Sequence, residues 1–150
     1  MTVQEVFDIA INLIDAQNEN TGSTHTADTR EYELRTPSLL NSLLDRVYPY
    51  SDTFYAPGKG VRAVCEKVHS LEDMIDLDDY ICSAVLPYGL AALLVKEENP
   101  DTAAFCWQMF EEGKEDARKH MPASTFDSVE DVYGYGCHGG IEYGEFGSWL

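Results

Sequence analysis

Cysteine and histidine lie close together at two places in this sequence, and both side chains can bind metal ions or take part in catalysis. His69 follows Cys65 by four residues, and His138 directly follows Cys137. If the fold brought both pairs together, they would supply the four ligands of a tetrahedral zinc site. Their spacing matches no zinc-finger pattern, so we expect structural residues here, and neither a metal ion nor a cofactor.

Cys137 and His138 are also the one adjacent pair that could supply a nucleophile and a base. Adjacent residues seldom point at each other, and the glycines around this pair provide no rigid frame. The acidic clusters elsewhere in the chain lack the spacing and the glycine of a calcium-binding loop. The sequence also contains no glycine loop of the kind that binds phosphate. We therefore expect a protein without enzymatic activity.

The charge of the chain is strongly negative. The sequence has 27 acidic and 10 basic residues, a formal net charge of -17. Direct binding to nucleic acid is disfavoured, because contacts with phosphate need lysine and arginine. The charge fits a well-solvated surface, and it also fits a wall that must face DNA without binding it.

The cysteines indicate a reducing environment. They are far apart in the sequence and form no CxxC pair, and Cys82 and Cys106 lie within helical apolar patterns. A free cysteine in such a pattern behaves as a small apolar residue. The N-terminus predicts a polar amphipathic helix rather than a signal peptide. Reduced thiols in the cytoplasm are the expected state.

The stretch Leu77–Pro100 is the longest mostly apolar run, and it predicts the central helix of the fold. Apolar residues occur on every side of this helix, which is typical of a buried one. Asn99 and Pro100 have the types that cap one helix and begin the next. Pro87 predicts a kink, because it cannot donate a backbone hydrogen bond. A membrane span is not expected, since it needs roughly 20 uninterrupted apolar residues. The acidic residues that favour a helix start here are Asp76, Asp78 and Asp79.

Three more helices are predicted around the central one. Thr2 and Glu5 have the spacing of a capping box, before a helix that runs to about residue 17. A second helix is expected from about residue 28 to residue 48, with a kink or short break at Pro37. A last helix is expected from Pro100 to about residue 120, with Ala103, Cys106, Trp107, Phe110 and Ala117 on its buried face.

The two connections in the first half of the chain differ in character. Residues 18–29 are polar and contain Gly22, so they predict a mobile loop. Residues 53–68 combine β-branched and aromatic residues with turn residues, and they predict a small β-hairpin. With Lys59, Arg62 and Lys67, this hairpin is the most basic local stretch. It is either an ordinary surface hairpin or a loop that reaches toward a neighbouring molecule or DNA.

Together these elements predict a mainly α fold, a helical bundle of about four helices with a small β-hairpin and an extended C-terminal arm. Residues 1–120 are expected to form the bundle, and residues 121–150 the arm. Phe105 and Met109 point away from the buried face of the last helix. They indicate either a helix covered from two sides within the bundle or a possible subunit contact.

The C-terminal segment is rich in glycine and aromatic residues and contains no lysine or arginine. Its glycines exclude a stable helix, and its aromatic residues argue against simple disorder. We expect an arm that becomes ordered on a partner, in preference to one that folds back onto its own helices. The candidate residues for binding a partner or a neighbouring subunit are Val132, Tyr133, Tyr135, Ile141, Tyr143, Phe146 and Trp149.

Two stretches together resemble one known family. They are LDDYICSAVLPYGLAALLVKEENPDTAAFCWQMFEE (residues 77–112) and, after a spacer, DVYGYGCHGGIEYGEFGSW (residues 131–149). They are similar to the head–tail connector proteins of long-tailed bacteriophages, also called adaptor or head-completion proteins. Members of that family are similar in length and begin with a short amphipathic helix. The segment DVYGYGCHGGIEYG resembles an expanded form of the family's shorter DVYGGI-type ending.

The resemblance implies a virion protein without catalytic activity. It implies a helical bundle whose copies form a homo-oligomeric ring, commonly of twelve copies, beneath the portal protein. Such a ring joins the portal to the next neck or tail-completion protein, and DNA passes through without specific binding. It implies location in the virion neck after assembly in the host bacterial cytoplasm, and Val132–Trp149 as the arm that enters the portal. The alternative is an acidic regulatory protein that mimics DNA and binds a basic partner.

Overall fold

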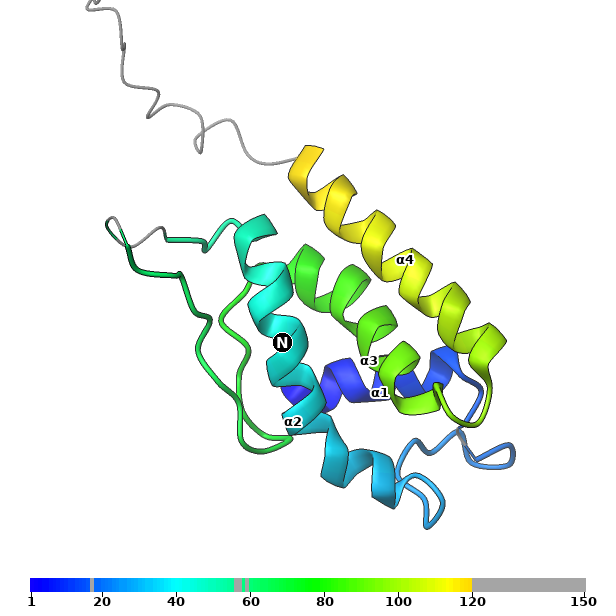
Figure 1. The fold of residues 1–150 in the computed structure, drawn as a ribbon. Coiled ribbons are helices and arrows are strands. Elements are labelled where there is room, and N and C mark those ends of the chain that lie inside the picture. The colour runs from blue at the N-terminus through cyan, green and yellow to red at the C-terminus, as the bar shows by residue number, and fades with distance from the viewer. Residues whose placement is uncertain (17, 56–57, 59, 120–150) are drawn as a thin grey trace, which may run out of the picture.

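Four α-helices pack around one apolar core in the computed structural model, which describes residues 1–16, 18–55, 58 and 60–119 (Figure 1). The predicted mainly α fold of about four helices is confirmed. A short 3₁₀ turn, η1, extends the second helix, and a π-helical turn, η2, precedes the third. The elements are α1 (Val3–Leu13), α2 (Arg30–Val47), η1 (Tyr48–Tyr50), η2 (Ile81–Val85), α3 (Leu86–Val95) and α4 (Pro100–Lys119).

Helix α1 begins with the predicted capping box. The Thr2 hydroxyl accepts a hydrogen bond from the Glu5 backbone N–H at 3.2 Å, and the Glu5 carboxylate accepts one from the Thr2 N–H at 2.7 Å. The helix ends earlier than expected because Asp15 adopts a left-handed conformation, with φ of 54°. Hydrogen bonds from Asp15 N–H to the Asn12 carbonyl and from Ala16 N–H to the Ile11 carbonyl then close the last turn.

Helix α2 contains Pro37 without an interruption, so the predicted short break does not occur. Pro37 has no N–H to donate, and the Thr36 hydroxyl donates a 2.7 Å hydrogen bond to the carbonyl of Tyr32. Both features are known to bend helices. Figure 1 shows that α2 changes direction between its N-terminal third and the remainder.

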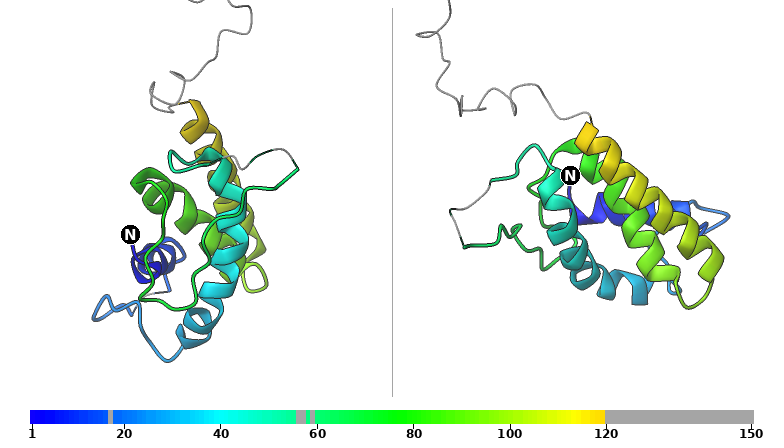
Figure 2. Two further views of the ribbon diagram at one scale, coloured as in Figure 1. Left: turned by 90° about the vertical axis from the view of Figure 1, so that its left-hand side faces the viewer. Right: turned by 45° about the horizontal axis from the view of Figure 1, so that its top comes forward.

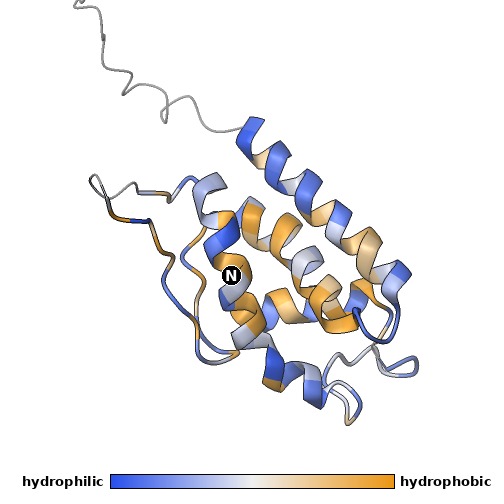
Figure 3. Ribbon diagram, in the orientation of Figure 1, coloured by the Kyte–Doolittle hydropathy of each residue, from blue (hydrophilic) through white to orange (hydrophobic). Residues whose placement is uncertain are grey.

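Helix α3 lies at the centre of the bundle and contacts α1, α2 and α4. Its residues are buried on nearly all sides, as its apolar sequence predicts, and Figure 3 shows its hydrophobic colour along the helix. Gly89 allows a close approach to α4, because an added Cβ would lie only 2.7 Å from a ring carbon of Phe110. The glycine therefore sets how tightly α3 and α4 pack.

The irregularity expected at Pro87 takes the form of the π-helical turn η2 immediately before it. The Leu86 N–H donates to the carbonyl of Ile81, five residues back, instead of the usual four. Asp78 caps this turn, with its carboxylate accepting the Ile81 N–H at 3.1 Å. Of the three aspartates expected at this helix start, Asp78 is the one that accepts the N–H of Ile81.

Helix α4 starts as predicted, with Pro100 in its first position and the Asn99 side chain accepting the Thr102 N–H at 3.1 Å. It runs alongside α3 for much of its length (Figure 2). Ala103, Cys106 and Phe110 are buried against the bundle. Within the described residues, no helix has both the length and the apolar content that crossing a membrane requires.

The predicted β-hairpin over residues 53–68 is wrong: its described residues form no strand. Val61 and Val64 remain exposed, and the buried residues Cys65 and Val68 join the core of the helical bundle instead of a sheet. Asn41 on α2 instead takes the place of a strand partner. Its side-chain amide donates to the Val68 carbonyl at 2.7 Å and its carbonyl oxygen accepts the Val68 N–H at 2.9 Å.

Candidate interaction surfaces

The predicted partner-binding residues of the C-terminal arm lie outside the described residues. Helix α4 ends at Lys119. The arm therefore stays a prediction from sequence, and so do the positions of Cys137 and His138. The arm residues concerned are Val132, Tyr133, Tyr135, Ile141, Tyr143, Phe146 and Trp149.

The predicted subunit-contact residues lie on the outer side of α4. Phe105 is 60% exposed and Met109 is half-buried. Cys106 directly follows Phe105 and Phe110 directly follows Met109, and both of these side chains are buried in the core. Glu112 and Asp116 continue the same side at helical spacing, because they follow Phe105 by 7 and 11 residues. We call Phe105, Met109, Glu112 and Asp116 the outer stripe of α4. It presents apolar side chains first and carboxylates after them.

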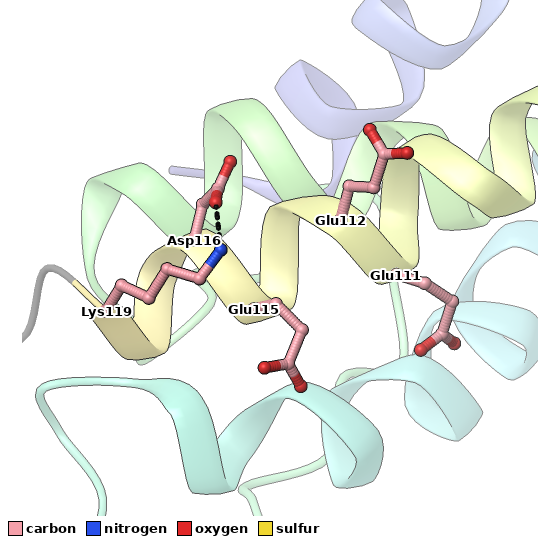
Figure 4. Close-up of a pocket in the computed structure, with 5 residues that line it drawn as sticks. All are labelled: Glu111, Glu112, Glu115, Asp116 and Lys119. Carbon is pink, nitrogen blue, oxygen red and sulfur yellow. Dashed lines mark hydrogen bonds and ion pairs between the residues drawn. The ribbon is translucent and has the colours of Figure 1, made fainter.

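Carboxylates gather on the C-terminal half of α4 (Figure 4). Three of them pair with basic residues of the same helix: Glu111 with Lys114 at 2.8 Å, Glu115 with Arg118 at 3.8 Å and Asp116 with Lys119 at 3.2 Å. Within the described part of the chain, Glu112 has no ion pair, and its carboxylate accepts a hydrogen bond from the Gln108 amide at 2.8 Å. Glu112 is thus the carboxylate of the outer stripe whose charge no basic residue neutralises there.

A second exposed surface lies on the connection between η1 and η2. Tyr55, Val61 and Val64 are 76%, 65% and 60% exposed. Arg62 lies beside them, and it forms no ion pair with any described residue, whereas Lys67 pairs with Asp45. We call Tyr55, Val61, Arg62 and Val64 the loop surface. It combines apolar side chains with a positive charge that no described residue pairs.

The three cysteines of the described part are buried and form no disulfide with one another. Burial raises the pKa of the Cys65 and Cys106 thiols, and it raises the pKa of Cys82 to about 11. Each thiol is therefore protonated at neutral pH, whereas nucleophiles and zinc ligands are thiolates. Among the described residues, no three histidine, cysteine or acidic side chains come together as a metal site, and His69 is exposed to solvent.

His25 occupies an organised position that sequence reasoning missed, because it lies within the polar stretch 18–29 that predicts a mobile loop. One ring nitrogen lies 2.7 Å from a Glu33 carboxylate oxygen, and the other lies 2.9 Å from the Gln4 amide nitrogen and 3.4 Å from Asp8. The Thr24 hydroxyl donates to Asp8 at 2.7 Å rather than to the imidazole.

These contacts connect the 18–29 loop, which was expected to be mobile, to both α1 and α2. Gln4 and Asp8 are one turn apart on α1, so they form a polar strip beside the loop. That spacing was the only local sign of this contact. The third partner, Glu33, lies on another helix and could not be paired with His25 from sequence alone.

Lys114 is a second residue whose position the sequence did not indicate. It is only 8% exposed, and its ammonium group lies 4.8 Å from the ring centre of Phe110 and 5.6 Å from that of Tyr50. Glu111 supplies the compensating charge. These contacts hold η1 against α4 through cation–π attraction.

Comparison with protein-family models, characterised proteins and solved structures found no significant match to this chain.

Proposed function

We propose that this chain is a structural head-to-tail adaptor of a bacteriophage neck. In this proposal, copies of the helical bundle form a ring beneath the portal, around the DNA channel, and join the portal to the next neck protein. The supporting observation is a well-packed helical core combined with exposed apolar side chains, which include Phe105 on the outer stripe of α4 and Val61 and Val64 on the loop surface. Exposed apolar groups on an otherwise acidic surface are typical of protein contacts.

The charge of the chain supports a position beside DNA that does not bind it. The chain has 27 acidic and 10 basic residues, a formal net charge of -17. A phosphate backbone that passes such a surface meets repulsion and few free cations. Acidic walls of this kind would let DNA slide through the neck during packaging and ejection.

The extended arm, residues 121–150, is proposed as the segment that holds the portal. The experiment is a deletion of Tyr133–Leu150 in the full chain, compared with a variant in which the same residues are replaced by a glycine–serine segment of equal length. We expect both variants to keep the helical circular-dichroism spectrum, because the described core contains none of the deleted residues. Both should lose association with the portal protein encoded in the same gene neighbourhood.

Cryo-electron microscopy of particles carrying the full chain would then locate it in the virion, with the neck as the expected position. Portal association of the deletion variant at the level of the full chain would remove the arm from this proposal. If the chain is found elsewhere in the particle, or in no particle at all, the proposed adaptor function is wrong.

One observation favours the alternative of an acidic DNA mimic: the carboxylates of α4 lie along one helix at regular spacing. A mimic would compete with DNA for a basic DNA-binding protein, and it would form no ring on a portal. A competition assay, with labelled duplex DNA displaced from host nucleoid proteins, tests this. Displacement by the wild-type chain but not by a Glu111→Gln/Glu112→Gln/Glu115→Gln variant would favour the mimic.

A further inference from the structure

We propose that the outer stripe of α4 binds the loop surface of a second copy of this chain. This inference rests on the proposed ring and specifies one contact between neighbouring subunits. The outer stripe supplies Phe105, Met109 and Glu112, and the loop surface supplies Tyr55, Val61, Arg62 and Val64.

The two surfaces are complementary in chemistry. Phe105 and the loop residues Val61 and Val64 are each at least 60% exposed, so a contact between them removes apolar area from water on both sides. Arg62 and Glu112 each lack an ion pair within the described part of their chain. Each side therefore combines exposed apolar side chains with one charge that no described residue pairs, and the two charges have opposite signs.

The loop surface and the outer stripe cannot contact each other within one molecule. Figure 1 and the right-hand view of Figure 2 both show the η1–η2 connection projecting from the side of the bundle away from α4. The contact must then form between copies, with the loop of one on the helix of the next. A contact between two different surfaces leaves a free surface on each end of the pair. It therefore closes into a ring or continues as a filament.

A single loop on a single helix makes a small contact. Stable interfaces bury roughly 1,200–2,000 Å² in total, which one loop and two helical turns do not reach. The contact should thus be weak in isolation and add up when several copies are held around one axis. Self-association in solution is accordingly expected at high protein concentration and low salt.

The experiment is a charge exchange followed by sedimentation velocity over a range of concentrations. Arg62→Glu and Glu112→Arg each place two like charges opposite each other, so each should weaken self-association at least about tenfold. The double variant Arg62→Glu/Glu112→Arg restores opposite charges and should recover association. Arg30→Glu and Glu19→Arg, which make the same charge changes at other exposed positions, should leave association unchanged.

Three results would overturn this contact: a wild-type chain that stays monomeric at high concentration, single variants that associate like wild type, or a double variant that does not recover. Circular dichroism of each variant would exclude misfolding as the cause. The adaptor proposal fails separately, on portal association. A monomeric wild-type chain that still binds the portal would remove only this contact, and a self-associating chain that ignores the portal would remove only the adaptor.

Discussion

The α3–α4 contact and the connection from residue 51 to residue 80 obtain their structure in different ways. Between the helices, order comes from apolar packing at close range, with Gly89 under the ring of Phe110. In the connection, single polar side chains hold the backbone: Asn41 at Val68, Asp73 at Ser70 and Asp78 at Asp52. One region therefore depends on buried volume, and the other depends on a few hydrogen bonds.

The largest loss of stability is expected when a buried side chain is removed from the α3–α4 contact. Phe110→Ala should lower the free energy of unfolding by about 3–5 kcal/mol, because a fully buried ring is removed and a cavity remains. Phe105→Ala, the same substitution on the exposed side of the same helix, should change it by less than about 0.5 kcal/mol. Urea denaturation followed by circular dichroism measures both. Equal losses from the two variants would mean that Phe105 is buried in the protein in solution.

The structure of the connection should depend most strongly on the side chain of Asn41, which lies on α2 and bonds the Val68 backbone. Asn41→Ala leaves the Val68 N–H and carbonyl without partners, at a cost of about 1–3 kcal/mol. Hydrogen exchange at the Val68 amide should accelerate, while the amides of α3 should respond only to the global change. Ser42→Ala is the control, since its exposed hydroxyl bonds only to the Leu39 carbonyl of the same helix. Unchanged protection of Val68 in the Asn41 variant would show that another group holds this backbone.

A smaller loss is expected where the helices approach most closely. Gly89→Ala places a Cβ 2.7 Å from one ring carbon of Phe110 and 3.2 Å from a methyl carbon of Leu43. The overlap should exceed the gain in helix propensity and leave a net loss of about 1–2 kcal/mol. At Gly113 the nearest atom, a methyl carbon of Val85, is 3.1 Å away, so Gly113→Ala should cost less. A Gly89→Ala protein at least as stable as wild type would show that the ring can move aside.

The smallest effect concerns the charge of Asp73. Its carboxylate accepts the N–H groups of His69 at 2.7 Å and Ser70 at 3.0 Å and the Ser70 hydroxyl at 2.7 Å, and these bonds lower its pKa. A carboxyl group whose pKa is lowered by folding stabilises the native state above its unfolded pKa, about 3.9. That contribution is lost as the pH falls through the lowered value.

Asp73→Asn keeps an acceptor oxygen and removes the charge, so it should be less stable than wild type at pH 7. The difference should shrink as the pH falls below about 4 and vanish once Asp73 is protonated in both states. Thermal unfolding from pH 7 to pH 3 measures it. A difference that stays constant over this range would assign the effect to geometry rather than charge.

The helical part of this fold was predictable because its signals are local. The Thr2–Glu5 capping box and the Asn99–Pro100 start of α4 lie within one helical turn, and both were confirmed. The burial of α3 followed from its apolar residues alone. The early end of α1 was missed, because a left-handed aspartate replaces the glycine that usually marks such an end.

Features that join distant parts of the chain were not predictable. Residues 53–68 have the composition of a hairpin, but the partner of Val68 is a side chain 27 residues away on α2. His25 likewise has its partners on two helices, and Lys114 lies between rings of α4 and η1. Phe105 was correctly placed on the outer side of α4 by helical spacing. Its role in contacts, like that of the arm, stays a prediction.

The π-helical turn at Ile81–Val85 has a consequence for how this chain can change in length. A π turn contains one residue more than the α-helical turn it replaces, so a deletion there could restore a regular helix without breaking it. Because the shorter turn covers the same rotation, such a deletion should leave Asp78 and Leu86 on the faces that they occupy now. The Asp78 carboxylate would then keep its hydrogen bond with the Ser51 hydroxyl. A chain one residue shorter at this point could therefore keep the same anchor between η1 and α3.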